Sequence, residues 1–252
     1  MPHGRVKGVI LAGGQGTRLR PLSYYFQKCM IPVGHIQKPI LEYIIRLFQH
    51  HGVTDVSMLV GYKHEQIVNY FNSGDRFGVK ISYVLDNDKY QGSGGSVLNF
   101  HQKTPINEDD TLVIYYGDII SNIDLQQMLK EHHKTQAIAT LALTQGYQVR
   151  VGIAEIDGHD IIQWREKPTL DLYAGIGIMT LSGAAMTELN ELYTTSPTKA
   201  IDIMSHFVPY LLQKKRRVKA FVTKAFWYDV GSTERYEKLE NSALEKALPF
   251  IK

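Results

Sequence analysis

The sequence has little of what defines several large classes of protein. Cys29 is the single cysteine among 252 residues, which excludes a disulfide framework and a zinc site built from cysteines, and suits a reducing compartment. No apolar run approaches the length of a membrane span. The N-terminus leads directly into a strand-like segment instead of the hydrophobic region of a signal peptide. These absences predict a cytoplasmic protein with no membrane partner.

A large excess of charge of either sign is also lacking. Lysine and arginine number 28 against 25 aspartates and glutamates, a formal net charge of +3. This charge is too small and too dispersed for a nucleic-acid footprint. The run of four cations at 214–217 is also consistent with a solvated turn at the end of a helix. The sequence therefore predicts small-molecule partners and no nucleic acid, and it is compatible with a homo-oligomer.

Apolar residues are numerous enough for a large core. Hydrophobic side chains make up 44% and charged side chains 21% of the chain, close to the averages of globular proteins. In the first 135 residues, short apolar runs alternate with segments of helical periodicity. The expected strands are 6–11, 55–60, 79–85 and 111–116, and the expected helices are 39–48, 64–71, 95–102 and 125–133. This alternation predicts a Rossmann-like α/β fold with a mostly parallel sheet flanked by helices.

Beyond residue 135, strand-like and helical segments no longer alternate regularly. Strands are expected at 137–143, 151–155, 161–165, 174–181 and 217–222, and helices at 182–192, 200–213 and 232–246. Because no linker separates the two parts, we expect one mixed sheet within a single domain over residues 1–252. The C-terminal part shows none of the hexapeptide periodicity of a β-helix.

The strongest motif is the glycine-rich segment LAGGQGTRL, residues 11–19, directly after the first expected strand. Its three glycines let the backbone curl tightly and aim amide groups at an anion. It is not a P-loop, because no Gly-Lys-Ser/Thr follows, and Leu19 stands where a dinucleotide fingerprint has its third glycine. Arg18 and Lys28 follow as cations that a triphosphate requires. A glycine-rich turn with two solvated cations is the alternative.

A second motif is Asp118, which follows the expected strand 111–116 in the sequence YGD. Ligands of open α/β sheets bind at the carboxyl ends of strands, and Mg²⁺ takes only one or two protein carboxylates. Asp229, in the segment WYDVG at 227–231, is available as a partner. A helix cap or an Asx-turn is the alternative for Asp118.

Two weaker motifs are the segment EKP at 166–168 and the glycine-rich loop at 91–96. Lys167 could meet a monophosphate, although a charged surface turn explains the same residues. The loop precedes an expected helix, where backbone amides could hold an anion or a base.

In this order, the motifs resemble those of the sugar-1-phosphate nucleotidyltransferases, which act on sugars such as glucose-1-phosphate and mannose-1-phosphate. The resemblance covers nearly the whole chain and rests on residues 11–19, 28, 60–62, 117–118, 166–168, 174–175 and 227–231. It implies the nucleotide-diphospho-sugar transferase type of fold. It also implies a single catalytic domain without the C-terminal β-helix that many relatives carry.

The activity implied by this resemblance is an attack of a sugar-1-phosphate on the α-phosphate of a nucleoside triphosphate, with Mg²⁺ as cofactor and pyrophosphate as leaving group. The catalytic residues would be Arg18, Lys28 and Asp118, with Asp118 and Asp229 holding the metal. The nucleotide would contact Leu11, Ala12, Gly13, Gly14, Gly16, Thr17, Gly92 and Ser93. The sugar phosphate would contact Lys167, Glu166 and Gly152.

Two other functions stay open. A glycosyltransferase with a related sheet would normally show Asp-x-Asp, whereas Asp118 is followed by two isoleucines. A non-catalytic protein that binds nucleotide sugars would keep the glycine loop while losing cations or the metal carboxylate. The segment 92–95 reads GSGG where many relatives have GTAG, which leaves the base undetermined.

Overall fold

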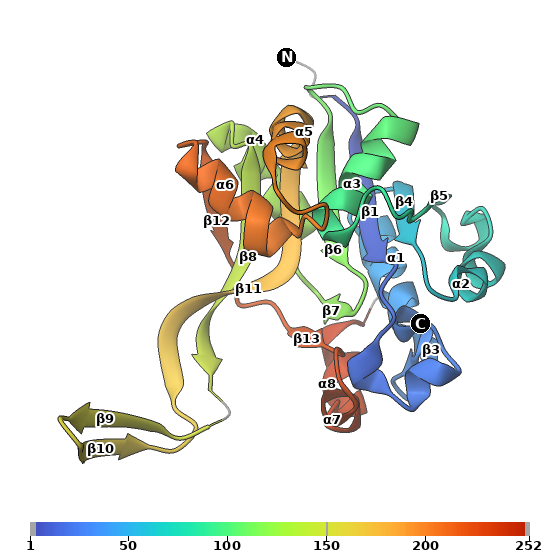
Figure 1. Ribbon diagram of the computed structural model, residues 1–252. Helices are drawn as coiled ribbons and strands as arrows, with labels where there is room; N and C mark the ends of the chain where they lie inside the picture. Colours follow the sequence, from blue (N-terminus) through green and yellow to red (C-terminus); the bar gives the residue numbers. More distant parts are fainter. Residues whose placement is uncertain (1–3, 150, 250–252) are drawn as a thin grey trace.

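A seven-stranded sheet organises the chain (Figure 1). The structure is a computed structural model that describes residues 4–149 and 151–249; the first three residues, where we expect no signal sequence, lie outside this part. The strand order is β12-β8-β11-β6-β1-β4-β5, and β11 is antiparallel to both of its neighbours while the remaining pairs are parallel. The bounds are β1 Val6–Ala12, β4 Asp55–Val60, β5 Lys80–Leu85, β6 Thr111–Tyr116, β8 Ala139–Gln148, β11 Thr169–Ser182 and β12 Val218–Val222. The predicted mixed, mostly parallel sheet is confirmed.

Helices cover both faces of this sheet (Figure 1). One face packs against α1 (Ile40–His50), α2 (His64–Phe71) and α4 (Leu125–Thr135), and the other against α3 (Gly92–Lys103), α5 (Ala185–Thr195) and α6 (Val208–Gln213). Phe48 of α1 is fully buried and meets the ring of Tyr115 edge to face at 5.7 Å. Because both faces are covered, β6 and the middle of β1 are apolar and buried almost throughout.

Short elements join the glycine-rich segment to the C-terminal part. Three 3₁₀ turns, Thr17–Leu19, Leu22–Tyr24 and Lys28–Met30, precede the small pair β2 (Pro32–Val33) and β3 (Lys38–Pro39). A second pair, β7 (Ile119–Ser121) and β13 (Trp227–Asp229), is antiparallel. Sequence patterns did not predict either pair, because two or three residues are too few to show a period.

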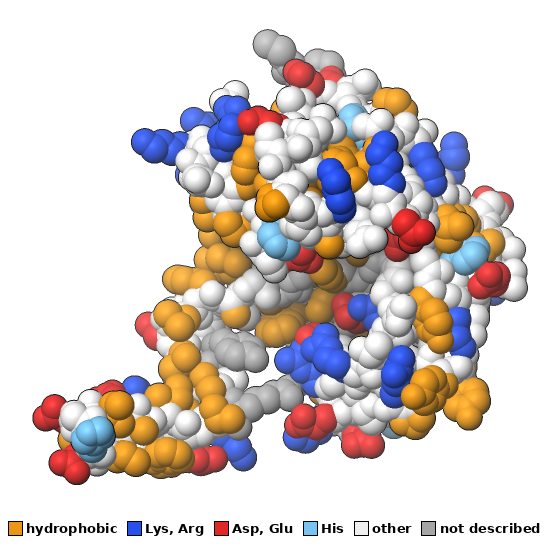
Figure 2. All heavy atoms as spheres, in the orientation of Figure 1, with side chains coloured by type: hydrophobic (Ala, Val, Ile, Leu, Met, Phe, Trp, Pro, Cys, Tyr) orange, Lys and Arg blue, Asp and Glu red, His pale blue; other side chains and the backbone are white. Residues whose placement is uncertain are grey.

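Part of the chain projects from this body as an arm, which we define as residues 144–149 and 151–175 (Figure 1). The outer halves of β8 and β11 pair beyond the sheet, and a hairpin of β9 (Ile153–Asp157) and β10 (Asp160–Arg165) forms its tip. Apolar side chains of the arm that are more than half exposed are Val151, Ile156, Ile161, Ile162, Trp164, Leu172 and Tyr173. They form much of the arm's visible surface in Figure 2. The prediction that all of these strands extend one sheet is therefore wrong for β9 and β10.

The predicted helix over 232–246 is also wrong as a single element. It is divided into α7 (Thr233–Glu237) and α8 (Asn241–Ala247), with Glu240 in an extended conformation between them. Leu239 and Leu244 both pack on the cluster that contains Leu19 and Ile40. Five residues of α-helix rotate by about 140°, so one continuous helix could not present both side chains to this cluster. The predicted helix over 200–213 begins as a π-helical turn, Ile203–Phe207. No helix in the described part of the chain is long and apolar enough to cross a membrane.

We expect His132 to make the stability of the fold depend on pH. Its ring is 2% exposed, its Nδ1 lies 2.9 Å from Thr140 Oγ1, and burial, with the neighbouring His133, lowers its pKa to about 4. The unfolded chain takes up this proton below about pH 6.5, so the contribution is complete above that pH and is lost as pH falls toward 4. Between pH 7 and pH 4 the wild type should lose on the order of 3 kcal/mol relative to His132→Asn, which cannot titrate. Urea unfolding at several pH values checks this, and parallel curves for the two proteins would contradict it.

Candidate active site

The predicted functional segments meet at one edge of the sheet. Strands β1, β4, β5 and β6 run parallel, so their carboxyl ends lie side by side. The glycine-rich segment leaves β1 at this edge, Asp86 follows β5, and Gly117 and Asp118 follow β6. This edge is where ligands of open α/β sheets bind.

The glycine-rich segment curls back on Lys28. Gly16 has φ +63°, and a Cβ atom there would lie 2.8 Å from Lys28 Cβ. Both the left-handed backbone and this close approach require glycine. A Cβ atom at Gly14 would lie 3.6 Å from Lys28 Nζ, so the loop and the ammonium group face each other. Thr17 begins the 3₁₀ turn that carries Arg18 toward Asp229 and Gly231.

Lys28 and Asp118 form an ion pair with 2.7 Å between Nζ and Oδ2. Burial lowers the pKa of Lys28, but the carboxylate of Asp118 outweighs it, and the pKa is raised. The ammonium group of Lys28 is therefore protonated at neutral pH, and its charge is paired with that of Asp118. An incoming phosphate would compete for this ammonium group.

Gln27 holds Lys28 in place. Its side chain is fully buried, its amide nitrogen donates to the Ala12 carbonyl at 2.7 Å, and its amide oxygen accepts from the Cys29 backbone at 2.6 Å. The Gln27 backbone amide donates to Gln66 Oε1 at 2.7 Å. These bonds join the turn that carries Lys28 to the glycine-rich segment and to α2. Ala12 thus serves the site through its backbone.

Cys29 is inert in this arrangement. Its thiol is fully buried against Gly117, and burial raises its pKa to about 12. A thiol with this pKa is protonated at neutral pH and is not a nucleophile.

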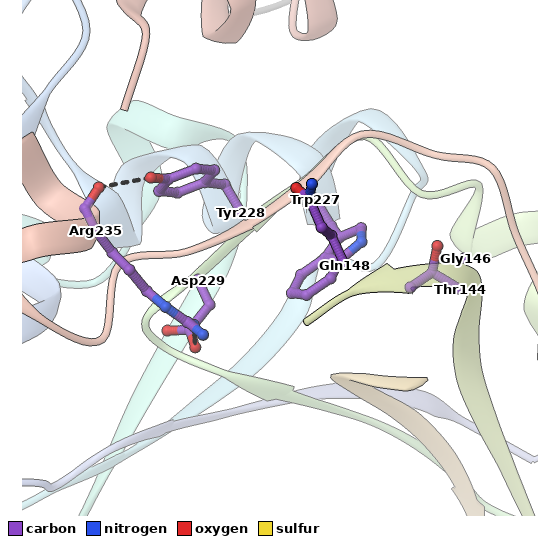
Figure 3. Close-up of a pocket in the computed structure, with 7 residues that line it drawn as sticks. All are labelled: Thr144, Gly146, Gln148, Trp227, Tyr228, Asp229 and Arg235. Atoms are coloured by element: carbon purple, nitrogen blue, oxygen red, sulfur yellow. Dashed lines mark hydrogen bonds and ion pairs between the residues drawn. The ribbon is translucent and has the colours of Figure 1, made fainter. Parts of the chain in front are cut away.

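Three adjoining pockets follow the carboxyl edge. The loop pocket, about 300 Å³, is lined by Leu11, Gly13, Gly14, Lys28, Leu59, Asp86, Gly92, Ser93, Ser96 and Tyr116. The central pocket, about 640 Å³, shares Tyr116 with it and is lined by Arg18, Asp118, Ile119, Leu141, Leu143, residues 174–177, Met204, Val208, Trp227, Asp229 and Arg235. The arm-side pocket, about 290 Å³, continues from Trp227, Asp229 and Arg235 to Thr144, Gly146, Tyr228 and Gln148 (Figure 3). Figure 2 shows the molecule hollowed between the sheet and the C-terminal helices, with acidic and basic side chains together at the rim.

Asp118 and Asp229 are brought to the same pocket by the β7–β13 pair. Asp229 lies opposite Ile119 in that pair, and the Val230 amide donates to the Asp118 carbonyl at 2.9 Å. Asp229 is itself paired with Arg235, whose guanidinium group turns into the pocket (Figure 3). Two segments more than 100 residues apart thus supply the predicted carboxylates.

These two carboxylates are the donor type that a divalent cation takes, although each is also paired with a cation, Lys28 or Arg235. Hard oxygen donors suit Mg²⁺, which keeps several waters and substrate oxygens and takes few protein ligands. Among the described residues, no cluster of three or more His, Cys, Asp or Glu side chains could hold a metal without such help. The donor set therefore favours an ion that arrives with a phosphorylated substrate.

The start of α3 has fewer free amides than the sequence suggests. The amides of Gly94 and Gly95 both donate to the Ile201 carbonyl, at 2.8 and 3.2 Å, so they cannot also bind a ligand. The Ser93 hydroxyl lies 2.7 Å from Asp202 Oδ2 and 3.2 Å from the Tyr116 hydroxyl. Gly92 and Ser93 nevertheless line the loop pocket, as predicted.

The residues predicted for the sugar phosphate do not line the central pocket. Glu166 and Lys167 are exposed at the arm, and Gly152 lies against the ring of Trp164. Lys167 is nevertheless close to the arm-side pocket, because its carbonyl accepts from Gln148 Nε2 at 3.4 Å. Its φ of +44° is uncommon for a residue other than glycine. The structure thus separates these three residues from the glycine-rich loop.

Sequence patterns missed two polar residues of the site, Asp86 and Arg235, and gave Ser96 no role of its own within the loop at 91–96. Asp86 follows a strand end as Asp118 does, so the same positional argument could have found it. Ser96 donates to Asp86 Oδ1 at 2.7 Å. Burial raises the pKa of Asp86, and the bond from Ser96 opposes that rise. No sequence motif marks Arg235, because it reaches the pocket only through the turn of the chain that follows Asp229.

A family model described as nucleotidyl transferase matches residues 7–246. The chain belongs to this family. The resemblance inferred from the motifs is thereby confirmed.

Individual relatives differ in the nucleotide that their names give. A UTP–glucose-1-phosphate uridylyltransferase of Synechocystis is 29% identical over 98% of this chain and 65% of its own length. A D-glycero-alpha-D-manno-heptose 1-phosphate guanylyltransferase of Aneurinibacillus thermoaerophilus is 29% identical over 93% of this chain and 97% of its own length. A candidate glucose-1-phosphate thymidylyltransferase of Bacillus anthracis, solved with sucrose, superposes with a TM-score of 0.75 at 24% identity, covering 95% of this chain and 94% of that one. The chain spans just under two thirds of the Synechocystis relative.

Proposed function

We propose that this protein forms a nucleotide sugar and pyrophosphate from a nucleoside triphosphate and a sugar-1-phosphate. The observation that carries the proposal is the continuity of the loop pocket and the central pocket at Tyr116 and at the Lys28–Asp118 pair. A glycine-rich backbone on one side and a wider, partly apolar pocket on the other suit a nucleotide and a sugar. Glucose-1-phosphate and mannose-1-phosphate are the acceptors that we expect, and a reduced Cys29 is consistent with a cytoplasmic location.

Charge balance supports Mg²⁺ as the cofactor of this reaction. Arg18, Lys28 and Arg235 line the pockets as cations, and Asp86, Asp118 and Asp229 line them as carboxylates, so their formal charges cancel. A triphosphate and a sugar phosphate would add several negative charges to a site without a positive surplus. Held by Asp118 and Asp229, Mg²⁺ would supply that charge to the phosphate oxygens.

The residues of the site would act by holding and aligning the reactants. The backbone amides from Gly14 to Thr17 and the guanidinium group of Arg18 bind the triphosphate, and Lys28 contacts the α-phosphate. A sugar-phosphate oxygen in the central pocket then attacks the α-phosphorus in line with the departing pyrophosphate, without a covalent enzyme intermediate. Such alignment is worth an effective concentration of about 10⁵ M or more for well-oriented groups. The cations stabilise charge that grows on the transferred and leaving phosphates.

The two alternative functions predict different products. A glycosyltransferase consumes a nucleotide sugar and releases no pyrophosphate, and a binding protein releases nothing. The test is a matrix of five nucleoside triphosphates against several sugar-1-phosphates, with Mg²⁺ present and pyrophosphate as the readout. We expect pyrophosphate release that needs both substrates. Absence of release from every pair, with the protein folded, would contradict the proposed reaction.

The role of Asp118 can be tested in the same assay. Asp118→Asn keeps the shape of the side chain but removes the charge that faces the metal and Lys28, so kcat should fall by about two orders of magnitude or more. The response to Mg²⁺ concentration should change as well. Asp109→Asn is a suitable control, because Asp109 is exposed just before the opposite end of β6. Near-normal turnover with an unchanged Mg²⁺ requirement would rule out the metal assignment.

Lys167 tests whether the arm takes part in binding the sugar phosphate. A charge-assisted hydrogen bond contributes about 1.5–3 kcal/mol, so Lys167→Ala should raise the KM for the sugar phosphate by about ten- to hundred-fold. Affinity for the triphosphate should stay nearly constant. Lys219→Ala, an exposed lysine on β12 outside the three pockets, is the control. Calorimetry with each ligand alone would show whether both affinities fall equally or neither falls, and either result counts against the assignment.

A further inference from the structure

The loop pocket contains a carboxylate that the proposed reaction does not use. Asp86 stands directly after β5, and one of its oxygens accepts from Ser96 at 2.7 Å. Asp118 and Asp229 each face a cation, whereas Asp86 makes no ion pair within residues 4–149 and 151–249. The charge of Lys103 lowers the pKa of Asp86 from beyond ion-pair distance, but a partly buried carboxylate with no cation in contact is still costly in the free protein. Its presence in a pocket therefore points to a ligand that supplies hydrogen-bond donors.

Its position separates Asp86 from the phosphate-binding groups. A Cβ atom at Gly13 would collide with Asp86 Oδ2, and one at Gly61 would lie 2.9 Å from the same oxygen. The neighbouring Gly14 faces Lys28 instead. Within the glycine-rich segment, Gly13 therefore lies against the Asp86 carboxylate, and Gly14 lies against the ammonium group of Lys28. A nucleotide with its phosphates at Lys28 would have another part of the molecule at Asp86, because phosphates and a carboxylate repel each other.

The rest of the loop pocket suits a flat base. Leu11 and Leu59 are paired in register at the ends of β1 and β4 and line the pocket with apolar surface. Gly92, which has no side chain, also lines the pocket. One apolar surface with a polar group at its edge is a common composition of a site that reads a base.

The hydrogen-bonding edges of the bases differ in what they offer a carboxylate. Guanine presents two adjacent donors, N1–H and the N2 amino group. Adenine and cytosine each place an acceptor beside their amino group, and uracil and thymine place N3–H between two acceptors. A carboxylate has only acceptors, and its two oxygens can meet two neighbouring donors. The other bases bring at least one acceptor against it.

We propose that Asp86 selects guanine, so that the nucleotide substrate is a guanosine triphosphate read at N1–H and N2–H by the Asp86 carboxylate. This inference rests on the proposed function, because it takes the loop pocket as the nucleotide site. Ser96 is a positioning residue, since its hydroxyl orients the carboxylate through Oδ1. The relatives named above use three different nucleotides by name, so family membership leaves the base open.

Calorimetric titration of the free protein with Mg²⁺ and a series of triphosphates tests the inference. GTP should bind most tightly, ahead of ATP, UTP, CTP and dTTP. Inosine triphosphate keeps N1–H and lacks the N2 amino group, so it should bind about ten- to hundred-fold more weakly than GTP. Deoxy-GTP and 3′-deoxy-GTP should bind as GTP does. In Asp86→Asn, GTP and inosine triphosphate should bind within about threefold of each other, because an amide offers one acceptor where the carboxylate offers two.

Variants of Ser96 test its positioning role, and a variant of Asp88 serves as the control. Ser96→Ala should reduce the preference for GTP over inosine triphosphate while leaving the affinity for inorganic triphosphate unchanged, and Ser96→Thr should restore the preference. Asp88→Asn makes the same chemical change at an exposed residue outside the loop pocket and should behave as the wild type does.

The other outcomes overturn the inference in distinguishable ways. Tightest binding of UTP, dTTP, CTP or ATP would refute guanine selection and leave the proposed reaction standing. Weaker binding of a deoxy analogue, with inosine triphosphate equal to GTP, would assign Asp86 to the ribose. Binding of no triphosphate by folded protein would refute the proposed function together with this inference.

Discussion

The ion pair between Lys28 and Asp118 is the contact on which the site depends. Lys28 lies in the turn after the glycine-rich segment and Asp118 follows β6, and each charge compensates the burial of the other. Neighbouring hydrogen bonds hold both residues in place. The Gln27 side chain joins the turn of Lys28 to the glycine-rich segment, and the Val230 amide joins Asp118 to the residue after β13. Removing one partner would leave a partly buried charge, which is far more costly than losing both. The pair thus makes the glycine loop, β6 and the C-terminal segment one unit.

Much of the fold could be predicted from the sequence because its first half consists of regular βα units. The strands at 55–60 and 111–116 and the helix at 64–71 agree with the structure residue for residue. These segments are buried on a periodic face or on both faces, so their hydrophobic pattern is strong. Of the site, the glycine loop, Lys28, Asp118 and Asp229 were predicted to act together, and the structure brings them to adjoining pockets.

The remainder depends on contacts that no local pattern encodes. The break at Glu240 follows from two leucines that must reach one cluster in the body. Arg235 reaches the pocket only through the turn that follows β13, and the exclusion of Gly94 and Gly95 from ligand binding depends on the carbonyl of Ile201, more than 100 residues away. The separation of Lys167 from the glycine loop follows from the length of β8 and β11, which the sequence pattern underestimated at both outer ends. Tertiary packing, rather than propensity, decides each of these.

The attachment of the arm has a consequence for how such a protein can be modified. Among the described residues, β8 and β11 are the strands that lead from the sheet into the arm, and their outer halves pair with each other instead of with the body. The backbone ladder that joins β6, β1, β4 and β5 is complete without them. A designer could therefore exchange the ribbon for one of another length or sequence without breaking a hydrogen bond beneath the glycine loop. The length and sequence of the arm could then be varied independently of the strands that carry the glycine loop, with β8 and β11 as the points of graft.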